Sequence, residues 1–480
     1  MATQTVRAVD HKLLAAGEWV ETGEWDEVLS PYDGTVVGRV AQGDAALVDR
    51  AAKAAQKAFD AGFPQHERAA VLERAADLVG ERLEDLALTI AAEAGKLLKT
   101  AEVEAARCVD TLGFSAVEAR KLSGGTVPME ASPAGAGKLG VMLRVPYGVV
   151  GAISPFNFPL NLVAHKLGPA IAAGNAVVLK PAGQTPISAL KLAAVLVEAG
   201  LPDGWLSVIP GPGSDVGNAI VEHELTRALT FTGSSKVGWG IRSRVPHKKV
   251  NLELGSTAPL IVHADGDWET AADKAKLHAF SHAGQSCISI QRVLVHEEIA
   301  DPFVERLVAN AAALQVGDPL DPETDVGPLI SPEDRDRVKQ WVDEAVAAGA
   351  ELLAGGELVD EGRCMAPTLL GSPPREAKVW CEEVFGPVAT IDRYRDFGEA
   401  LRLANDSKFG LQAGVFTRDV GRGLEAATRL EFGGVLINEV PTFRADQMPY
   451  GGVKDSGNTR EGPAYAVLEL TEERLVTLQG

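Results

Sequence analysis

One cysteine, one glutamate and one asparagine could together form a nucleophilic site. Cys287 follows a Gly-Gln-Ser turn and precedes an apolar, β-branched run, so a tight loop could present its sulfur to a cleft. The thiolate is the reactive form of cysteine, and it becomes available when neighbouring groups lower the thiol pKa. Glu253 offers a base 34 residues earlier (287 − 253), and Asn157 offers an amide that could hold an oxyanion. A lone cysteine is more often a core residue, so it is the combination that indicates chemistry.

The other cysteines show no pattern of a metal site or of disulfides. Cys108, Cys364 and Cys381 are scattered along the chain, and no two cysteines form a CxxC pair. Scattered thiols are typical of packing residues in a reducing compartment, so we expect a cytoplasmic protein. No histidine spacing suggests a ligand set, and we predict no metal.

Composition and charge limit the possible partners. The chain has 480 residues, enough for two or three domains, and a formal net charge of −20. An acidic surface argues against nucleic acid and anionic membranes, although a local basic pocket could still take an anionic substrate. The first ten residues lack the apolar stretch of a signal peptide. The most apolar region, 147–180, is interrupted by three prolines, His165 and Lys166, which predicts a buried strand–helix–strand unit and not a membrane span.

The elements that must position these side chains follow from hydrophobic periodicity. Residues 12–42 alternate short apolar runs with turns, as a β segment does, and residues 44–122 have the spacing of about three helices. From residue 146, apolar runs alternate with helical stretches, which predicts a parallel sheet with right-handed crossovers, a dinucleotide-type domain. The runs lie at 148–153, 176–180, 205–209 and 228–231, and the helical stretches at 161–173, 185–199 and 214–223.

A second series of strands and helices follows residue 285. It contains a strand at 292–296, a helix at 299–314 and a strand at 433–438. The glycine-rich residues 123–145 have the character of an extended arm, and residues 468–478 are strand-like. We predict that these two segments form an inter-subunit sheet, which favours a homodimer or a homotetramer.

Six motifs together resemble one enzyme family. They are Phe156-Asn-Phe-Pro159, Lys180-Pro181, Phe231-Thr-Gly-Ser-Ser-Lys-Val-Gly238, Glu253-Leu-Gly255, Gly284-Gln-Ser-Cys287 and Glu382-Glu-Val-Phe-Gly-Pro387. In order and approximate spacing the chain resembles the aldehyde dehydrogenase superfamily from about residue 15 to its C-terminus.

The resemblance implies an α/β fold of the aldehyde dehydrogenase type. Such a fold has two parallel-sheet α/β domains, a Rossmann-like cofactor domain and a catalytic domain, and a β-arm for oligomerisation. The implied boundaries are 1–123 and 146–255 for the dinucleotide-binding domain, 256–458 for the catalytic domain, and 124–145 and 459–480 for the arm and C-terminal strand.

The cofactor site is expected at glycine-rich turns, although no Gly-x-Gly-x-x-Gly follows the first strand. Gly233 and Gly238 bracket the start of a helix, where backbone N–H groups could face a pyrophosphate; the alternative is an ordinary glycine turn with a serine N-cap. Lys180 matches the family's lysine at the adenosine ribose. Many NAD-preferring members carry glutamate three residues later, where this chain has Gly183. Without that carboxylate we predict that NADP is tolerated as well as NAD, and a preference for NADP stays open.

The resemblance carries further positions into the cofactor set. Glu383 matches the glutamate that holds the nicotinamide ribose, and Phe385 matches the aromatic beside the ring. The full predicted set is Ile153, Ser154, Pro155, Phe156, Lys180, Gly183, Gly213, Gly217, Phe231, Gly233, Ser234, Val237, Leu254, Gly255, Glu383 and Phe385.

The implied chemistry is oxidation of an aldehyde to a carboxylic acid. Cys287 attacks the carbonyl, and the Asn157 amide with the Cys287 N–H holds the oxyanion of the thiohemiacetal. Hydride passes to the nicotinamide and leaves a thioester, which a water deprotonated by Glu253 hydrolyses.

The substrate is expected to be a small oxygenated or acidic aldehyde. Residues 440–457 match the family's substrate tunnel and resemble the branch acting on phosphonoacetaldehyde, lactaldehyde, succinate semialdehyde or, without phosphorylation, glyceraldehyde 3-phosphate. Arg444 is the candidate anion anchor and Arg107 a second candidate, since guanidinium pairs well with carboxylate or phosphate. Both arginines could instead form structural ion pairs. His282 could line the substrate channel, and Ser286 stands where some anion-binding relatives have arginine.

Two other functions remain open at this point. An acyl-transferring relative would pass the thioester to coenzyme A, but that branch often lacks the base that Glu253 provides here. A non-catalytic family member could lose Cys287, Glu253 or Asn157, and this chain retains all three.

Overall fold

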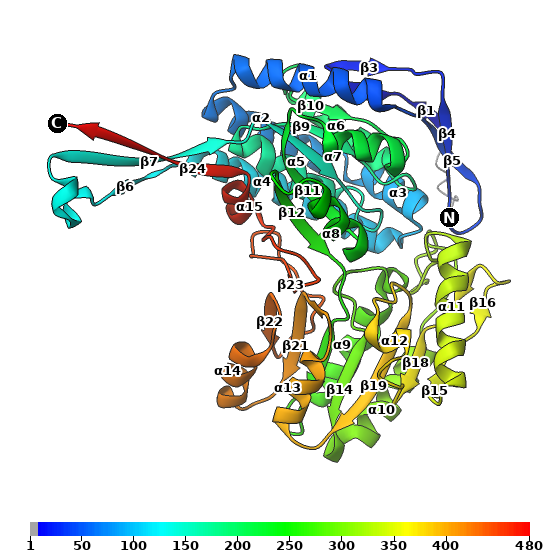
Figure 1. Ribbon diagram of the computed structural model, residues 1–480. Helices are drawn as coiled ribbons and strands as arrows, with labels where there is room; N and C mark the ends of the chain where they lie inside the picture. Colours follow the sequence, from blue (N-terminus) through cyan, green and yellow to red (C-terminus); the bar gives the residue numbers. More distant parts are fainter. Residues whose placement is uncertain (1–7) are drawn as a thin grey trace.

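The computed structural model describes residues 8–480. Two α/β units lie one above the other, and a long β-arm projects from the side of the upper unit (Figure 1). The expectation about a signal peptide depends largely on residues 1–7, which lie outside the described residues. No helix in the described part of the chain is both long and apolar enough to cross a membrane.

The upper unit is built on a seven-stranded sheet of order β12-β11-β8-β9-β10-β2-β3. The first five strands of this order are parallel, as predicted from the β–α alternation, and β2 and β3 add an antiparallel edge. The strands are β2 (Leu13–Ala15), β3 (Glu18–Val20), β8 (Val149–Ile153), β9 (Ala176–Lys180), β10 (Leu206–Val208), β11 (Thr226–Gly233) and β12 (Lys249–Leu254). Strands buried on both faces read as continuous apolar runs, which is why the sequence located β8, β9, β10 and β11.

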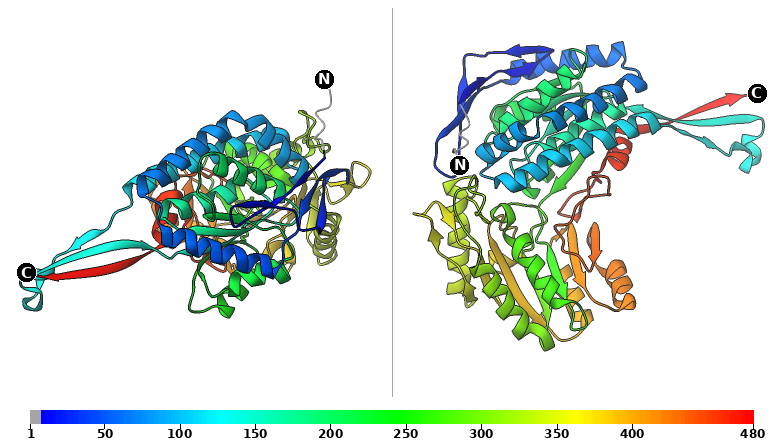
Figure 2. Two further views of the ribbon diagram at one scale, coloured as in Figure 1. Left: turned by 90° about the horizontal axis from the view of Figure 1, so that it is seen from above. Right: turned by 180° about the vertical axis from the view of Figure 1, so that it is seen from behind.

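Helices cover both faces of this sheet (Figure 2). The predicted helix at 161–173 forms with those bounds, whereas 214–223 is a π-helical turn, η3 (Gly213–Gly217), followed by α7. The helices are α1 (Ala45–Ala61), α2 (Gln65–Glu81), α3 (Leu83–Ala94), α4 (Leu98–Lys121), α5 (Asn161–Ala173), α6 (Pro186–Glu198), α7 (Asn218–Glu222) and α8 (Ser235–Arg244).

Residues 44–122 form four helices, not about three. A single residue, Arg82, separates α2 from α3, and Gly95 with φ of 62° ends α3 in a left-handed turn. The apolar spacing from Leu72 to Ile90 runs through the break at Arg82, so periodicity alone could not reveal it.

The lower unit holds a second seven-stranded sheet, of order β15-β18-β19-β14-β13-β21-β22. All neighbours are parallel except β15, which is antiparallel to β18. The strands are β13 (Pro259–Val262), β14 (Arg292–His296), β15 (Glu351–Ala354), β18 (Thr368–Gly371), β19 (Val388–Tyr394), β21 (Gln412–Phe416) and β22 (Gly434–Ile437). The helices are α9 (Trp268–Phe280), α10 (Glu297–Ala312), α11 (Pro332–Ala347), α12 (Lys378–Cys381), α13 (Phe397–Asn405) and α14 (Val420–Arg429).

Smaller sheets complete the two units. A three-stranded sheet of order β1-β5-β4 lies near the N-terminus, and β16 with β17 and β20 with β23 form two separate antiparallel pairs. Their strands are β1 (Val9–His11), β4 (Trp25–Leu29), β5 (Val36–Ala41), β16 (Leu358–Val359), β17 (Cys364–Met365), β20 (Phe409–Gly410) and β23 (Val453–Lys454).

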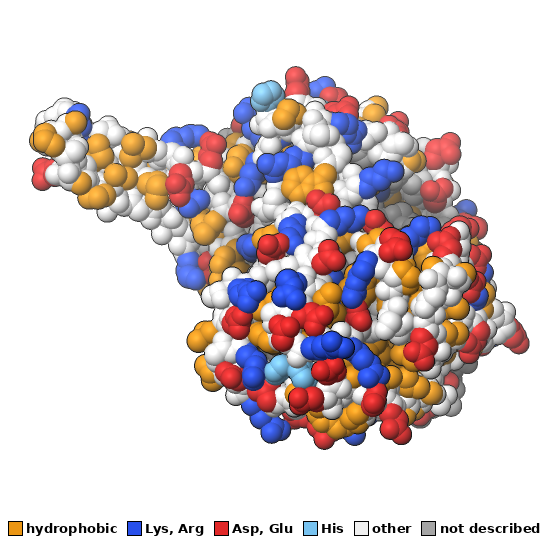
Figure 3. Space-filling view, turned by 60° about the horizontal axis from the view of Figure 1, so that its bottom comes forward, with side chains coloured by type: hydrophobic (Ala, Val, Ile, Leu, Met, Phe, Trp, Pro, Cys, Tyr) orange, Lys and Arg blue, Asp and Glu red, His pale blue; other side chains and the backbone are white. Residues whose placement is uncertain are grey.

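The arm is a three-stranded antiparallel sheet that joins two distant parts of the chain. It contains β6 (Gly125–Val127), β7 (Lys138–Pro146) and β24 (Thr471–Gln479) in the order β24-β7-β6. The two segments pair with each other within one chain, β24 with β7, and the inter-subunit sheet stays a prediction. The strand begins later than expected because α15 (Pro463–Glu469) occupies the first residues and buries Val467 in the upper core. Apolar side chains gather on the arm's surface (Figure 3), among them Leu139, Leu475 and Leu478, each more than half exposed.

Candidate active site

Cys287 lies in the loop between α9 and β14, at the junction of the two units. The short helix η4 (Ser281–Gly284) precedes it, and three successive residues there have left-handed backbone: His282 (φ 50°), Ala283 (φ 51°) and Gly284 (φ 72°). A Cβ at Gly284 would lie 2.0 Å from the Gly386 carbonyl oxygen, so this position requires glycine. Such backbone is costly for His282 and Ala283, and it clusters at functional loops. The loop leaves the cysteine half-buried.

Asn157 reaches this loop from the upper unit. Its side-chain amide donates a hydrogen bond of 2.9 Å to the backbone carbonyl of Gln285, two residues before the cysteine. The Gln285 side chain is itself held, because its Oε1 accepts from the Ile330 N–H at 2.8 Å. An asparagine amide carries two N–H groups, so the second can serve an oxyanion at the sulfur.

Two buried charges fix the segment that carries Asn157. Glu104, from α4, accepts the N–H groups of Leu160 and Asn161 at 3.0 and 3.1 Å and so caps the start of α5. Lys96 pairs with Glu104, and its ammonium lies 3.6 Å from the centroid of the Phe158 ring. Phe158, Leu160 and Asn161, which follow the asparagine, are therefore held by contacts from α4 and from the turn between α3 and α4.

Tyr450 is a neighbour of the nucleophile that sequence reasoning did not single out. Its hydroxyl lies 2.8 Å from the Cys287 sulfur. The guanidinium of Arg444 lies over the Tyr450 ring, 3.8 Å from the centroid. The sequence offered one signal for Tyr450: it lies in the predicted tunnel segment 440–457, six residues after Arg444 (450 − 444).

Glu253 is the penultimate residue of β12, and its carboxylate is buried inside the site. Its side chain is 1% exposed, and neither oxygen has a hydrogen-bond partner among the described residues. Burial and the nearby charge of Glu461 raise the pKa of Glu253 well above its usual range, against the opposing charges of Arg444 and Lys166. An unpartnered carboxyl with a raised pKa is suited to take a proton from water.

The same surroundings hold the cysteine as a thiol. Burial and the charge of Glu253 raise the pKa of the Cys287 thiol well above its usual range, and the hydrogen bond between Cys287 and Tyr450 acts in the opposite direction. The nucleophile and the base therefore influence each other's ionisation.

The two candidate anion-binding arginines differ in how fully they are paired. Arg107 uses its guanidinium on Asp446, with bonds of 3.0 Å from Nε and 2.8 Å from Nη2. Arg444 donates from Nη2 to Glu461 at 2.9 Å, and within residues 8–480 its buried Nε has no partner. Arg444 therefore keeps a donor that an anion could use.

His282 lies beside the site but makes no polar contact with it. Its side chain is buried, and neither ring nitrogen has a hydrogen-bond partner in the described part of the chain. Burial and the charge of Lys96 lower its pKa well below the usual range, so the ring is neutral. The Phe158 ring packs edge-on against it with centroids 6.5 Å apart.

Two predicted cofactor residues contact each other here: Gly255, which follows β12, and Glu383, which follows α12. A Cβ at Gly255 would lie 2.2 Å from Glu383 Oε2, so glycine makes room for this carboxylate, whose Oε1 accepts the Ser256 N–H at 3.0 Å. Burial raises the pKa of Glu383 to about 7. A cavity of about 510 Å³ is lined by Glu383 and by Ser234 at the start of α8. Val237, on the first turn of that helix, is half exposed.

Aromatic rings shape this region. A Cβ at Gly233 would lie 2.8 Å from the Phe231 ring, so the glycine admits the ring. Phe156 and Phe385 pack edge to face with centroids 5.7 Å apart, and Phe385 has a left-handed φ of 52°.

The remaining predicted cofactor residues lie at the carboxyl ends of β8, β9 and β12 and on η3. Lys180 is mostly buried, donates to the Pro181 carbonyl at 3.0 Å, and has its pKa lowered by burial. A Cβ at Gly217 would be in ordinary contact with the Lys180 side chain, whereas one at Gly183 would have no atom within 4 Å. The other members are Gly213 on η3, Leu254 at the end of β12, and Ile153, Ser154 and Pro155 at and after the end of β8.

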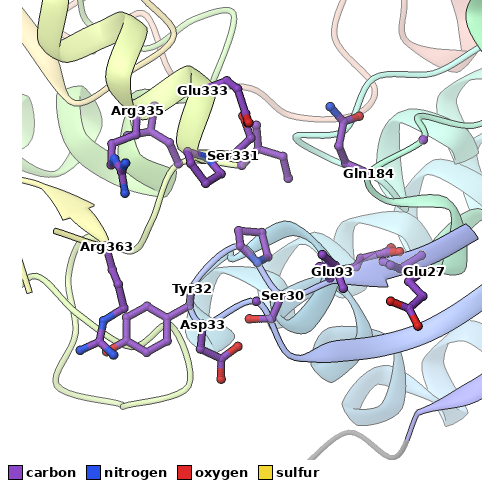
Figure 4. A pocket seen from close by; sticks show the side chains of 18 of the residues that line it. Glu27, Ser30, Tyr32, Asp33, Glu93, Gln184, Ser331, Glu333, Arg335 and Arg363 are labelled. Atoms are coloured by element: carbon purple, nitrogen blue, oxygen red, sulfur yellow. The ribbon is translucent and has the colours of Figure 1, made fainter. Parts of the chain in front are cut away.

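A cavity of about 770 Å³ lies between the N-terminal β segment and the lower unit. Figure 4 shows Tyr32 beside Arg363 on one side and Gln184 and Glu93 on the other. Its lining includes Gly183 but none of the three predicted catalytic residues. No group of three or more His, Cys, Asp or Glu in the described residues could hold a metal ion.

The comparisons with known proteins now decide the family. The model of the aldehyde dehydrogenase family matches residues 19–476. The chain belongs to the aldehyde dehydrogenase family. The 3-sulfolactaldehyde dehydrogenase of Priestia aryabhattai is 44% identical over 476 residues, 99% of each chain. Aldehyde dehydrogenase 21 of Physcomitrella patens, solved with the reaction product succinate, has a TM-score of 0.96, 38% identity and 99% coverage of both chains. The glyceraldehyde-3-phosphate dehydrogenase of Methanocaldococcus jannaschii, solved with NADP, has a TM-score of 0.91 and 38% identity, covering 95% of this chain and 100% of that one.

The predicted fold class, family and reaction class are confirmed. This aldehyde dehydrogenase is an NAD(P)-dependent oxidoreductase acting on the aldehyde group. The residues present fit a dinucleotide: Gly255 leaves space for the Glu383 carboxylate, and the cavity beside Ser234 opens at a helix start, where backbone N–H groups favour phosphate.

Proposed function

We propose that the enzyme oxidises small anionic aldehydes to carboxylic acids by thioester formation and hydrolysis. The observation that carries this proposal is the buried Glu253 carboxyl, which has no hydrogen-bond partner among the described residues and shares one site with Cys287 and Arg444. The balanced reaction consumes the aldehyde, one water and one NAD(P)⁺, and yields the carboxylate, NAD(P)H and two protons.

In the first half of the reaction a carbon–sulfur bond forms. The Cys287 thiol gives up its proton, and the sulfur attacks the aldehyde carbon while the carbonyl oxygen becomes an oxyanion. The free N–H of Asn157 and the Cys287 backbone N–H stabilise that charge; loss of one such donor typically costs ~10²–10³ in rate. Bound NAD(P)⁺ supplies the hydride acceptor. Once the hydride has left the carbon, the acyl group remains on Cys287 as a thioester.

In the second half Glu253 acts as general base. Its carboxylate removes a proton from water, the hydroxide attacks the thioester, and the carbon–sulfur bond breaks to release the acid and the thiolate. A base placed in this way supports hydrolysis over transfer to coenzyme A, which needs no activated water.

Arg444 supports an anionic substrate. Its buried guanidinium keeps an unpartnered Nε beside the ring that contacts Cys287, whereas Arg107 is engaged by Asp446. Two relatives are named for small anionic aldehydes, 3-sulfolactaldehyde and aspartate semialdehyde. The similar structure from Physcomitrella patens was solved with succinate, which is also a small anion. We infer that Arg444 binds the anionic group, and that Arg107 and His282 shape the walls.

The absence of a side chain at Gly183 supports tolerance of NADP. The open space around that position would accept a ribose 2′-phosphate near Lys180, without the repulsion that a glutamate would add. Under this proposal the predicted cofactor set surrounds the dinucleotide, the upper unit is the cofactor domain and the lower unit the catalytic domain.

The arm supports assembly into a homodimer or homotetramer, because its apolar side chains are exposed on the single chain. Four free cysteines support a cytoplasmic location.

The test is a kcat/KM panel with both cofactors. It compares propanal and benzaldehyde with lactaldehyde, glyceraldehyde 3-phosphate, succinate semialdehyde and 3-sulfolactaldehyde, with and without coenzyme A. We expect the anionic aldehydes to have the highest kcat/KM and the product to be a free acid. A flat panel would contradict the anion-binding role, and an acyl-coenzyme A product would contradict hydrolysis.

A further inference from the structure

Tyr450 contacts the nucleophile directly through its hydroxyl group. The Tyr450 oxygen and the Cys287 sulfur are 2.8 Å apart, and within residues 8–480 the hydroxyl has no other hydrogen-bond partner. The side chain is 1% exposed and packs with Ile288 and Leu411 in a small apolar cluster next to the cysteine. A buried tyrosine hydroxyl normally needs a partner, and here that partner is the sulfur.

The ring is held on several sides. The Tyr450 backbone exchanges two hydrogen bonds with Glu461, at 3.1 and 2.6 Å. The same Glu461 accepts from Arg444, whose guanidinium covers the ring face at 3.8 Å from the centroid. Backbone pairing and the stacked guanidinium therefore fix where the hydroxyl points.

The hydroxyl is suited to donate and not to ionise. Burial, with the nearby Cys287 and Glu253, raises the pKa of Tyr450 well above its usual range, so it keeps its proton. A thiolate has no proton to donate, so the bond between an ionised Cys287 and Tyr450 must run from the O–H to the sulfur. Charge-assisted bonds of this kind are about twice as strong as neutral ones.

We propose that Tyr450 is a positioning residue whose hydroxyl donates a hydrogen bond to the Cys287 sulfur and holds the thiolate in the orientation of attack. This inference rests on the proposed nucleophilic role of Cys287. The tyrosine gives up no proton, because the thiol proton leaves to solvent or to Glu253. When the carbon–sulfur bond forms, the sulfur loses its negative charge and its hydrogen bond to Tyr450 weakens.

The test is the Tyr450→Phe variant, which removes only the hydroxyl and keeps the ring under Arg444. The rate of Cys287 alkylation by iodoacetamide is followed against pH in the full-length protein by mass spectrometry of the peptide. We expect the titration to shift upward by about 1 pH unit and kcat to fall about tenfold, with the Kd for NADP unchanged. The matched control is Tyr394→Phe, which removes a buried hydroxyl that is hydrogen-bonded to His263 at the other end of the second sheet. This control should change neither the alkylation titration of Cys287 nor kcat.

The possible outcomes are distinct. An unchanged or lowered titration in Tyr450→Phe overturns the inference. If Cys287→Ala still turns over the aldehyde, the proposed function itself fails. If Tyr450→Phe does not fold, fluorotyrosine is incorporated at Tyr450 in the control protein Tyr394→Phe, which retains that tyrosine. Because it makes the hydroxyl a stronger donor, the Cys287 titration must move to lower pH; no movement overturns the inference.

Discussion

Asn157 and Gln285 join the two α/β units at the nucleophile. The Asn157 amide donates to the Gln285 carbonyl at 2.9 Å across 128 residues of sequence, and Cys287 follows two residues later. The proposed oxyanion donor is thereby tied to the backbone that carries the sulfur. If one unit shifted against the other, the oxyanion donor would move away from the sulfur. The geometry of the site therefore depends on the contact between the units.

Glu253→Gln should separate the two halves of the reaction. The amide cannot accept the water proton, so the thioester should persist after the first hydride transfer. We expect a burst of about one NADPH per site, followed by steady turnover reduced ~10²–10⁴-fold. Rapid-mixing absorbance at the NADPH band measures both phases. Cys287→Ala should show neither phase, and undiminished steady turnover in Glu253→Gln would contradict the base assignment.

The raised pKa of Glu253 also predicts a dependence of stability on pH. Because the folded-state pKa exceeds the unfolded value, the folded protein binds this proton more tightly. The contribution to stability is fully present below the ordinary glutamate pKa and is lost as the pH rises through the raised folded value. Glu253→Gln keeps a neutral group at all pH values. As the pH rises from mildly acidic to mildly alkaline, the melting temperature of the variant should therefore increase relative to that of the unaltered protein. A difference in melting temperature that stays constant with pH would contradict the raised pKa.

Gly183→Glu should shift cofactor preference toward NAD. There is space for a side chain, since no atom lies within 4 Å of a Cβ built there. The new carboxylate should repel a 2′-phosphate and lower kcat/KM with NADP by about tenfold or more. Gly183→Gln is the matched control, because it adds nearly the same volume without charge. Equal losses in the two variants would assign the effect to size.

Arg444→Gln and Arg107→Gln should affect different properties. Removal of the Arg444 charge should raise KM for an anionic aldehyde about tenfold or more and change propanal oxidation less. Removal of Arg107 leaves the buried Asp446 without its bidentate partner and should cost about 1–3 kcal/mol of stability, with little substrate selectivity. Kinetics with both aldehydes and thermal melts measure the two effects. A selective KM effect in Arg107→Gln would make that residue a substrate contact.

Leu475→Glu should disrupt assembly without unfolding the body of the enzyme. Leu475 lies on the arm strand β24 and is 57% exposed in the single chain, so a charge there costs little unless a partner covers it. Light scattering after size exclusion should show a smaller oligomer and unchanged circular dichroism. Glu473→Gln, on the same strand, is the control; an identical mass for Leu475→Glu would contradict the role of this face.

The sequence by itself determined the order of elements and the identity of the reacting groups. Buried parallel strands read as apolar runs, so β8, β9 and β14 were found within a residue or two, and the motif around Cys287 indicated the family. These features depend on local backbone geometry and burial, which short stretches encode.

Tertiary structure alone decided which partner each side chain has. Tyr450 meets the sulfur across 163 residues, and Arg107 is engaged by Asp446 across 339. Neither pairing leaves a local pattern, because it arises from how the two units and the segment 440–457 pack together. The same packing buries Glu253 beside Glu461, and that burial raises the pKa of the carboxyl proposed here as the general base.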